Sequence, residues 1–314
     1  AAKDFQIING GQTTASLSNA RYKDKCNLNE VFVQMKLTVI EKIADEEAIK
    51  LIQDISRSSN SQNKVSDADF FSTHPFHVQM EHFSQKLYAR AINDSQFDTK
   101  WFYERARGQY LQKQMRLTRA EKKKFLLQNP KNQLITKTDL AKVRNTWDGF
   151  PHIVSRGAQT NFIDFAEKTT KEWNKGEVDK FSDKYFQETV ALLLIYKYME
   201  KMIPNQTWYL QGYRANIITY TIAFMRMLIK KQFNNKDLDL ISIWSRQAVP
   251  NTVQQTLIDL SEKVYFKITD STRSVENVTQ WCKREECWNS VKNISYILPD
   301  SIENFLTAND KAFI

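Results

Sequence analysis

Two long segments in the middle of the chain carry apolar side chains with the period of an α-helix. They read DKYFQETVALLLIYKYMEKMI over residues 183–203 and YRANIITYTIAFMRMLIKKQF over residues 213–233. Apolar residues that recur every three to four positions lie on one face of a helix, and stripes this wide are buried against other helices. We therefore expect these segments to form the two central helices of a bundle, with their aromatic side chains in its core.

The first 65 residues have a different pattern of apolar and polar side chains. The segment VFVQMKLTVIEK, residues 31–42, alternates apolar and polar positions and is the best strand candidate of the sequence. A short apolar run precedes it around residues 5–8, and the following segment, 44–58, has helical spacing with acids in its first turn. We expect the order strand, glycine turn, helix, strand, helix, which is part of an α/β layer. Because two strands are too few for a stable sheet, residues that precede this chain in the natural protein are expected to supply the missing strands, so the chain is expected to be truncated at its N-terminus.

The fold class predicted from these patterns is mainly α, with a helical body and a small N-terminal α/β remnant. Residues 1–65 are expected to hold the C-terminal part of the α/β layer, and residues 66–235 the helical body. Residues 236–314 are expected to form a smaller helical subdomain, because the helices there shorten and Pro250 and Pro299 interrupt them. A chain of 314 residues with 41% hydrophobic side chains is long and apolar enough to bury a core.

Charge and cysteine content narrow the classes of partner and compartment. The chain has 45 Lys and Arg against 36 Asp and Glu, a net charge of +9, which favours nucleic acid or another polyanion as partner, although many soluble proteins are equally basic. No apolar run approaches the roughly 18 residues of a membrane span, and the first residues show no basic and then apolar leader, so we expect a cytoplasmic protein without membrane contact. The 3 cysteines form neither a zinc ribbon nor a disulfide framework.

Glycine is scarce, and two of the glycines are adjacent. The chain has 7 glycines, where average usage would give about 22. Gly10 and Gly11 lie in DFQIINGGQTTASLSNA, between an apolar run and a helix start, and such a turn can direct backbone N–H groups at a phosphate. In this interpretation Gln12 orients the phosphate, and Thr13 or Thr14 caps the helix. The alternative is an ordinary Asn-Gly turn that only reverses the chain.

Three further stretches combine polar, basic and aromatic residues. SRSSNSQNKVSDADFF, residues 56–71, is rich in amides and hydroxyls that suit phosphates or base edges, or it is a solvated linker with a good N-cap. WFYERARGQY, residues 101–110, interleaves aromatic and basic residues as single-strand binders do, or it is an aromatic core strand with arginines at its edge. KTDLAKVRNTW, residues 137–147, adds further basic residues, and Arg214 begins the second long helix, where free N–H groups can meet an anion.

These stretches supply the candidate residues for binding phosphate or nucleic acid. They are Asn9, Gly10, Gly11, Gln12, Thr13, Thr14, Arg57, Asn60, Asn63, Arg105, Arg107, Tyr110, Lys137 and Arg214.

A single cleft between the α/β part and the helical body is expected to collect several of these side chains. The residues expected to converge there are Gln12, Arg57, Asn63, Arg105, Arg107 and Arg214. Carboxylates such as Asp67, Glu104 or Asp139 are expected to pair with the arginines when no anion is bound. The rival interpretation is that the arginines are structural and that the cleft binds nothing.

Spacing alone identifies no catalytic constellation. STHPFHVQMEH brings His74, His77, Glu81 and His82 together, but it lacks the two histidines at i, i+4 with which a zincin holds its metal. No metal ligands are therefore proposed, and catalytic residues remain unassigned.

The order and wording of six motifs resemble a known family. QIINGGQTTASL, SRSSNSQNKVSDADFFSTHPFH, WFYERARGQY, KTDLAKVRNTW, PHIVSRGAQTNF and WYLQGYRANIITYTIA, spread over residues 5–225, resemble the AIPR family of bacterial abortive infection phage resistance proteins. This resemblance implies a role in phage defence. It carries no established reaction or catalytic residue to transfer.

A looser resemblance concerns the first 65 residues. Their order of elements is similar to that of ParB and sulfiredoxin-like domains, in which a D-G-Q-H-R or G-x-x-R turn binds nucleotide phosphates. The resemblance places Gly11 and Gln12 on the Gly-Gln of that turn, and Thr13 and Thr14 on its His-Arg pair. The missing arginine removes the main positive charge opposite the phosphate, so Arg57, Arg105 or Arg214 would have to replace it.

Two classes of function remain open from the sequence. The first is an effector that cuts nucleic acid or hydrolyses a nucleotide during phage infection, with a divalent metal as cofactor if it is a nuclease. The second is a non-catalytic adaptor that senses nucleic acid or a phage component and passes the signal to a protein partner, such as the product of a gene in the same defence operon.

Overall fold

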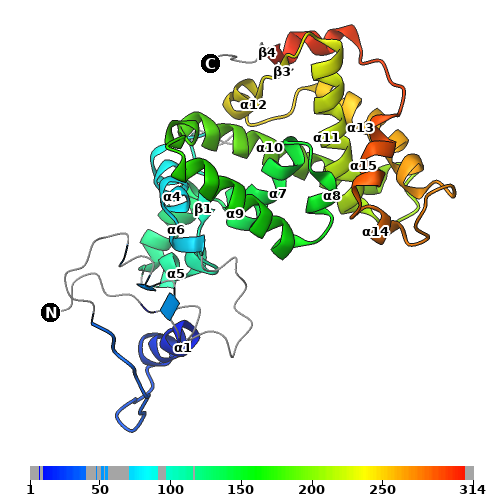
Figure 1. The fold of residues 1–314 in the computed structure, drawn as a ribbon. Coiled ribbons are helices and arrows are strands. Elements are labelled where there is room, and N and C mark those ends of the chain that lie inside the picture. Colours follow the sequence, from blue (N-terminus) through cyan, green and yellow to red (C-terminus); the bar gives the residue numbers. More distant parts are fainter. Residues whose placement is uncertain are drawn as a thin grey trace. The chain divides into compact units, whose positions relative to one another are not determined.

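A computed structural model describes residues 7, 10–39, 47, 51–52, 54–55, 71–90, 97–115 and 117–307. The chain divides into two compact units, residues 1–70 and 71–314, and each is described here by itself. The prediction of a mainly helical chain is confirmed, since the strands in the described ranges are two or three residues long (Figure 1). The boundary at residue 235 between the helical body and the smaller C-terminal subdomain stays a prediction.

In the first unit, the glycine pair leads directly into helix α1, Gly11–Tyr22. Gly10 is the N-cap in the left-handed region at φ 85°, which costs little only for glycine. The expectation that a threonine hydroxyl caps this helix is wrong, because the N-cap residue is Gly10, which has no side chain to accept an N–H of the first turn. The helix begins before the threonines, and Thr14 lies in its first turn, where its backbone N–H and its hydroxyl both donate to the Gly10 carbonyl, at 2.9 and 3.1 Å.

The strand predicted at residues 31–42 is not formed over residues 31–39, where the structure shows neither strand nor helix. A strand needs a partner for its backbone groups, and none pairs with this segment among the described residues. The side chains of Phe32 and Val39 are 91% and 76% exposed. The ParB-like layer is therefore not confirmed, and the strand expected before Gly10 lies outside the described residues, apart from Ile7. Of the helix predicted at 44–58, residues 47, 51, 52, 54 and 55 are described, and they are helical.

The second unit is built around long helices (Figure 1). Helix α7 packs on α9, α10 and α11, and α11 also packs on α13. Ile195 and Phe224, on the two segments predicted as central helices, are fully buried, so that prediction is confirmed. The bounds are α7 Lys137–Trp147, α9 Ala158–Asn174, α10 Asp183–Met202, α11 Arg214–Gln232 and α13 Asn251–Thr269.

A small two-stranded sheet with its own helices adjoins this bundle. Strand β1 pairs in parallel with β2, with Phe102 opposite Leu134 and Glu104 opposite Thr136, and α4 packs against β1. Figure 1 shows α4, α5 and α6 near β1. The bounds are η1 Phe71–Thr73, α4 Pro75–Lys86, β1 Phe102–Glu104, α5 Gln109–Met115, α6 Arg119–Gln128, η2 Lys131–Gln133 and β2 Leu134–Thr136.

Shorter elements complete the second unit. Strand β3 pairs antiparallel with β4, so the C-terminal end of the described chain lies beside the segment that follows α11. The bounds are α8 Pro151–Val154, η3 Val178–Lys180, η4 Ile203–Asn205, β3 Asp237–Leu238, α12 Leu240–Arg246, α14 Val278–Trp281, α15 Glu285–Lys292, η5 Asp300–Phe305 and β4 Leu306–Thr307.

Candidate functional site

The loop after β1 is held by one carboxylate from α4. Glu81 accepts a hydrogen bond of 2.9 Å from Arg105 Nε and another from the Gln109 side chain, and Lys113 Nζ lies 3.9 Å away. The other end of the Arg105 guanidinium donates to the Ser72 carbonyl at 2.6 Å. The Gln109 oxygen in turn accepts the backbone N–H of Arg105 at 3.1 Å. Arg105 is thus paired within the chain. Its carboxylate partner among the described residues is Glu81 and not Glu104 or Asp139, while Asp67 lies outside those residues.

The free backbone N–H groups at the Gly108 turn are bound by a carboxylate of the same chain. Gly108 has φ 83°, and the Glu104 carboxylate accepts its N–H at 3.0 Å and that of Tyr110 at 3.1 Å. These are the N–H groups that the start of α5 leaves without a helical partner. Glu104 therefore caps α5, and the glycine at this position serves a positive-φ turn.

A buried histidine lies behind this loop. His77 Nδ1 and the Tyr103 hydroxyl are 2.6 Å apart, and the His77 ring stacks on Phe162 at a centroid distance of 5.7 Å. Burial, and secondarily the positive charge of Lys137, lowers the pKa of His77 well below its usual value. His77 is consequently neutral at physiological pH, and it lies too deep in the core to exchange protons with a substrate.

Acidification is expected to destabilise the protein through His77. The folded-state pKa of His77 is depressed. Below about pH 6.5, His77 is therefore protonated in the unfolded chain while it stays neutral in the folded chain. This group then costs up to about 1.4 kcal/mol of unfolding free energy per pH unit, and the contribution is recovered above that pH. Urea unfolding of the wild type and of His77→Gln between pH 7.5 and 5 measures the effect, and the variant is expected to lose stability less steeply.

The matched control is His82→Gln, because His82 is exposed on the same helix. We expect stability to fall less steeply with acid in His77→Gln than in His82→Gln, because His77 is the buried residue of the two. Equal slopes for all three proteins would contradict the assignment of the pH dependence to His77.

Arg107 and Arg214 differ from Arg105. Both are exposed, and the structure gives neither a hydrogen bond nor an ion pair with any described residue. Arg107 is at the tip of the loop that Glu81 and Glu104 hold in place, and Arg214 is the first residue of α11. Arg107 lies between β1 and α5, which pack on each other, whereas α11 packs on α8 and α15.

The remaining candidates have mixed placements. Tyr110 is 3% exposed, and its hydroxyl donates to the Asn129 carbonyl at 2.7 Å, which favours the packing interpretation for this aromatic residue. Lys137 is buried, with its ammonium 5.5 Å from the centre of the Phe162 ring. Gly10, Gly11, Thr13 and Thr14 lie in the first unit, at the start of α1. Gln12 is helical, but its side chain is not described; Asn9, Arg57, Asn60, Asn63 and Asp67 lie outside the described residues. Because Gln12, Arg57 and Asn63 belong to the first unit and the other three arginines to the second, their convergence on one cleft stays a prediction.

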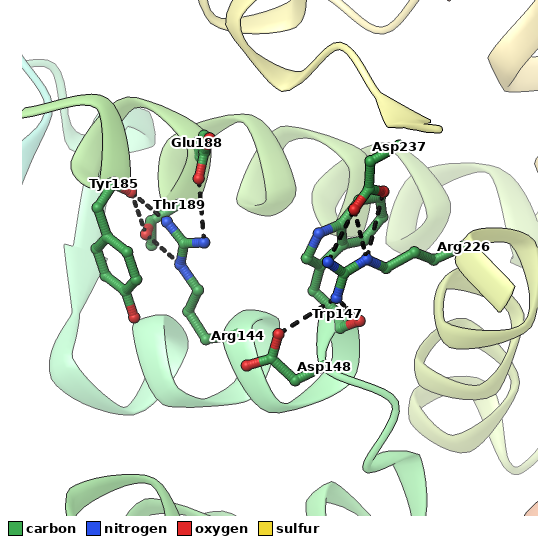
Figure 2. A network of polar contacts seen from close by, with 8 residues as sticks. All are labelled: Arg144, Trp147, Asp148, Tyr185, Glu188, Thr189, Arg226 and Asp237. Atoms are coloured by element: carbon green, nitrogen blue, oxygen red, sulfur yellow. Dashed lines mark hydrogen bonds and ion pairs between the residues drawn. The ribbon is translucent and has the colours of Figure 1, made fainter. Parts of the chain in front are cut away.

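Two other arginines hold the helical bundle together (Figure 2). Arg144, on α7, donates to the Thr189 hydroxyl at 2.7 Å and stacks on the Tyr185 ring at 3.5 Å from its centroid. Arg226, on α11, donates from two nitrogens to Asp237, at 3.0 and 2.8 Å. These contacts join α7 to α10 and α11 to β3.

Arg226 also closes the end of α7. Its Nη1 donates to the Trp147 carbonyl at 2.6 Å and to the Asp148 carboxylate at 3.2 Å (Figure 2). Trp147 is the last residue of α7, so this carbonyl has no partner within the helix. At the other end of α7, Asp139 forms a capping box with Thr136 and pairs with Lys142 at 3.2 Å. The polar contacts of Asp139 and Lys142 in the stretch KTDLAKVRNTW therefore serve to cap and stabilise α7.

No group of three or more His, Cys, Asp or Glu in the described ranges is arranged to hold a metal ion. Within the same ranges, every helix is too short or too polar to cross a bilayer.

Comparison with known proteins then identifies the family. A family model described as AIPR protein matches residues 1–272. The chain belongs to the AIPR family. This membership implies a role in abortive-infection phage defence. No curated protein and no solved structure matches the chain.

For this AIPR protein, sequence reasoning missed the residues that organise the loop after β1. Glu81 was considered only as a metal ligand, and the pairing of Gln109 with Glu81 was not predicted, because this contact joins residues 28 positions apart. The helix α6, with its run of lysines, was also missed, although TRAEKKK carries the Thr-x-x-Glu signature of a helix start.

Proposed function

We propose that this AIPR protein contributes to phage defence by binding the phosphate groups of a nucleic acid. The observation that carries the proposal is the contrast between two kinds of arginine in the second unit. Arg105, Arg144 and Arg226 are satisfied by carboxylates, backbone carbonyls and a hydroxyl of the chain itself. Arg107 and Arg214 are exposed and have no such partner among the described residues.

An exposed arginine on a rigid support suits phosphate recognition. Its guanidinium offers several N–H donors in one plane, which match two phosphate oxygens at once. Glu81 and Glu104 hold the loop that carries Arg107 at both of its ends. That support lowers the entropy lost when Arg107 is fixed on an anion. The net charge of +9 acts in the same direction at long range.

In the first unit, the turn Gly10–Gly11 before α1 supports the same function. It leaves no side chain over the start of the helix, where the helix dipole favours an anion. We propose that Gly10, Gly11 and Gln12 contact phosphate in the first unit, and that Arg107 and Arg214 contact phosphate in the second unit.

A binding panel tests the proposal and separates an effector from an adaptor. Single- and double-stranded DNA, RNA and ATP are each titrated with the purified chain, with and without Mg²⁺ or Mn²⁺, and products are resolved on a gel. We expect binding of at least one nucleic acid, weakened in Gln12→Ala. Cleavage that depends on the metal and is lost in Gln12→Ala would identify an effector nuclease, whereas binding without turnover would identify an adaptor. Absence of binding to every nucleic acid at low salt would overturn the proposal.

A further inference from the structure

Helix α6 presents a row of cations without partners. Arg119, Lys122, Lys123 and Lys124 are all exposed, and none of their side chains has a hydrogen bond or an ion pair with a described residue. The one acid of the helix does not neutralise them. Glu121 is held by the capping box, in which it accepts the backbone N–H and the hydroxyl of Thr118, each at 2.8 Å.

Three of these cations share one face with two leucines. Arg119, Lys122 and Lys123 are spaced i, i+3, i+4, and Leu126 and Leu127 continue the same stripe. These five side chains line one surface hollow. Leu127 is 68% exposed, and no residue of α6 is buried. A helix of a globular protein normally turns its apolar stripe to the core, so this stripe faces outward against the usual rule.

The helix is nevertheless fixed in place. The Phe125 ring packs on Tyr110 and Phe102, with centroids 5.5 and 5.9 Å apart. After the end of α6, the Asn129 carbonyl accepts the Tyr110 hydroxyl. These contacts at Phe125 and Asn129 anchor the C-terminal half of α6 to β1 and α5, while the other face of the helix stays exposed.

The composition of this face discriminates between possible partners. Protein interfaces are depleted in lysine, so a lysine-rich row fits a protein partner poorly. A helix that lies on a membrane keeps its cations and its apolar residues on opposite faces, whereas here they share one face. A nucleic-acid backbone offers a line of phosphates that matches a row of cations, with sugars that can rest on the leucines.

We infer that the α6 face, defined by Arg119, Lys122, Lys123, Leu126 and Leu127, binds the phosphate backbone of a nucleic acid. This inference rests on the proposed function and names the surface that carries it. The contacts are to phosphate and sugar, so they contribute affinity without reading sequence. None of these residues belongs to the Gly10–Gly11 turn or to the arginines considered above.

A triple charge removal tests the α6 face. The variant Arg119→Gln/Lys122→Gln/Lys123→Gln keeps helix-forming side chains while it removes three positive charges. Binding to a fluorescein-labelled DNA or RNA of fixed length is measured by anisotropy at several NaCl concentrations. For double-stranded DNA, we expect weaker binding and a log–log salt slope lower in magnitude by about 2 to 3, since each phosphate contact contributes about 0.9.

The matched control removes the same number of charges elsewhere. Lys171, Lys175 and Lys231 are exposed lysines outside α6, and the control variant carries Lys171→Gln/Lys175→Gln/Lys231→Gln. Circular dichroism of both variants checks that the fold is retained. Equal losses of affinity and slope in the two variants would show a net-charge effect only and would overturn the inference. An unchanged slope in the α6 variant, with wild-type binding intact, would overturn the α6 face while the proposed function stands; failure of the wild type to bind would overturn both.

Discussion

Replacing Arg226 by leucine is expected to lower the free energy of unfolding by about 3 kcal/mol. The substitution leaves the Asp237 carboxylate, whose side chain is only 14% exposed, without its bidentate partner. It also leaves the Trp147 carbonyl at the end of α7 without a donor. Lys230, 3.8 Å from Asp237, recovers only part of the loss. Urea denaturation followed by circular dichroism measures the change.

The double variant Arg226→Leu/Asp237→Leu is the matched control. Removing both partners leaves no unpaired carboxylate, so we expect it to be more stable than the single variant by at least about 1 kcal/mol. A single variant within about 0.5 kcal/mol of the wild type would contradict the role of Arg226 as the link between α7, α11 and β3.

Arg105→Ala is expected to lower stability, whereas Arg107→Ala is expected to lower the affinity for nucleic acid. Loss of Arg105 removes its contacts to Glu81 and Ser72, and with both side chains of the ion pair partly exposed we expect a cost of about 2 kcal/mol in stability. Loss of Arg107 breaks no contact with a described residue, so stability should stay within about 0.5 kcal/mol of the wild type. Affinity for nucleic acid is expected to fall about tenfold in Arg107→Ala, the loss of one charge-assisted phosphate contact.

Measuring unfolding and binding on the same two variants separates a structural arginine from a binding arginine. Arg214→Ala serves as a second member of the binding class, since Arg214 is exposed at the start of α11. A stable Arg105→Ala with weakened binding, or a destabilised Arg107→Ala with normal binding, would reverse the assignment.

The long helices could be predicted from the sequence because their signal is local. The stripes of α10 and α11 extend over five turns, and burial of residues such as Ile195 and Phe224 follows directly from the period. The segment 31–39 shows the opposite case. Its alternation predicts a strand, but a strand is formed only with a partner, and none is present among the described residues.

The polar contacts around β1 could not be predicted in the same way. WFYERARGQY allowed two interpretations, single-strand binding or an aromatic core strand. Its aromatic residues are buried, and of its two arginines only Arg107 is exposed without a side-chain partner among the described residues. Glu104 and Arg105 are used to hold the loop, through partners that the sequence places either 4 or 24 residues away. Gly108 adopts a positive-φ turn, and the anion that this turn accommodates is the Glu104 carboxylate of the same chain.

The central claim, that this AIPR protein binds nucleic acid through phosphates, is tested most directly by the salt dependence of wild-type affinity. Binding to one DNA duplex and one RNA strand is measured by anisotropy at a series of NaCl concentrations between about 50 and 200 mM, the range over which phosphate contacts weaken strongly. We expect the logarithm of the association constant to fall linearly with the logarithm of salt, with a slope of several units, as counterions are released. An association constant that does not change with salt, or no binding at the lowest salt, would contradict the claim.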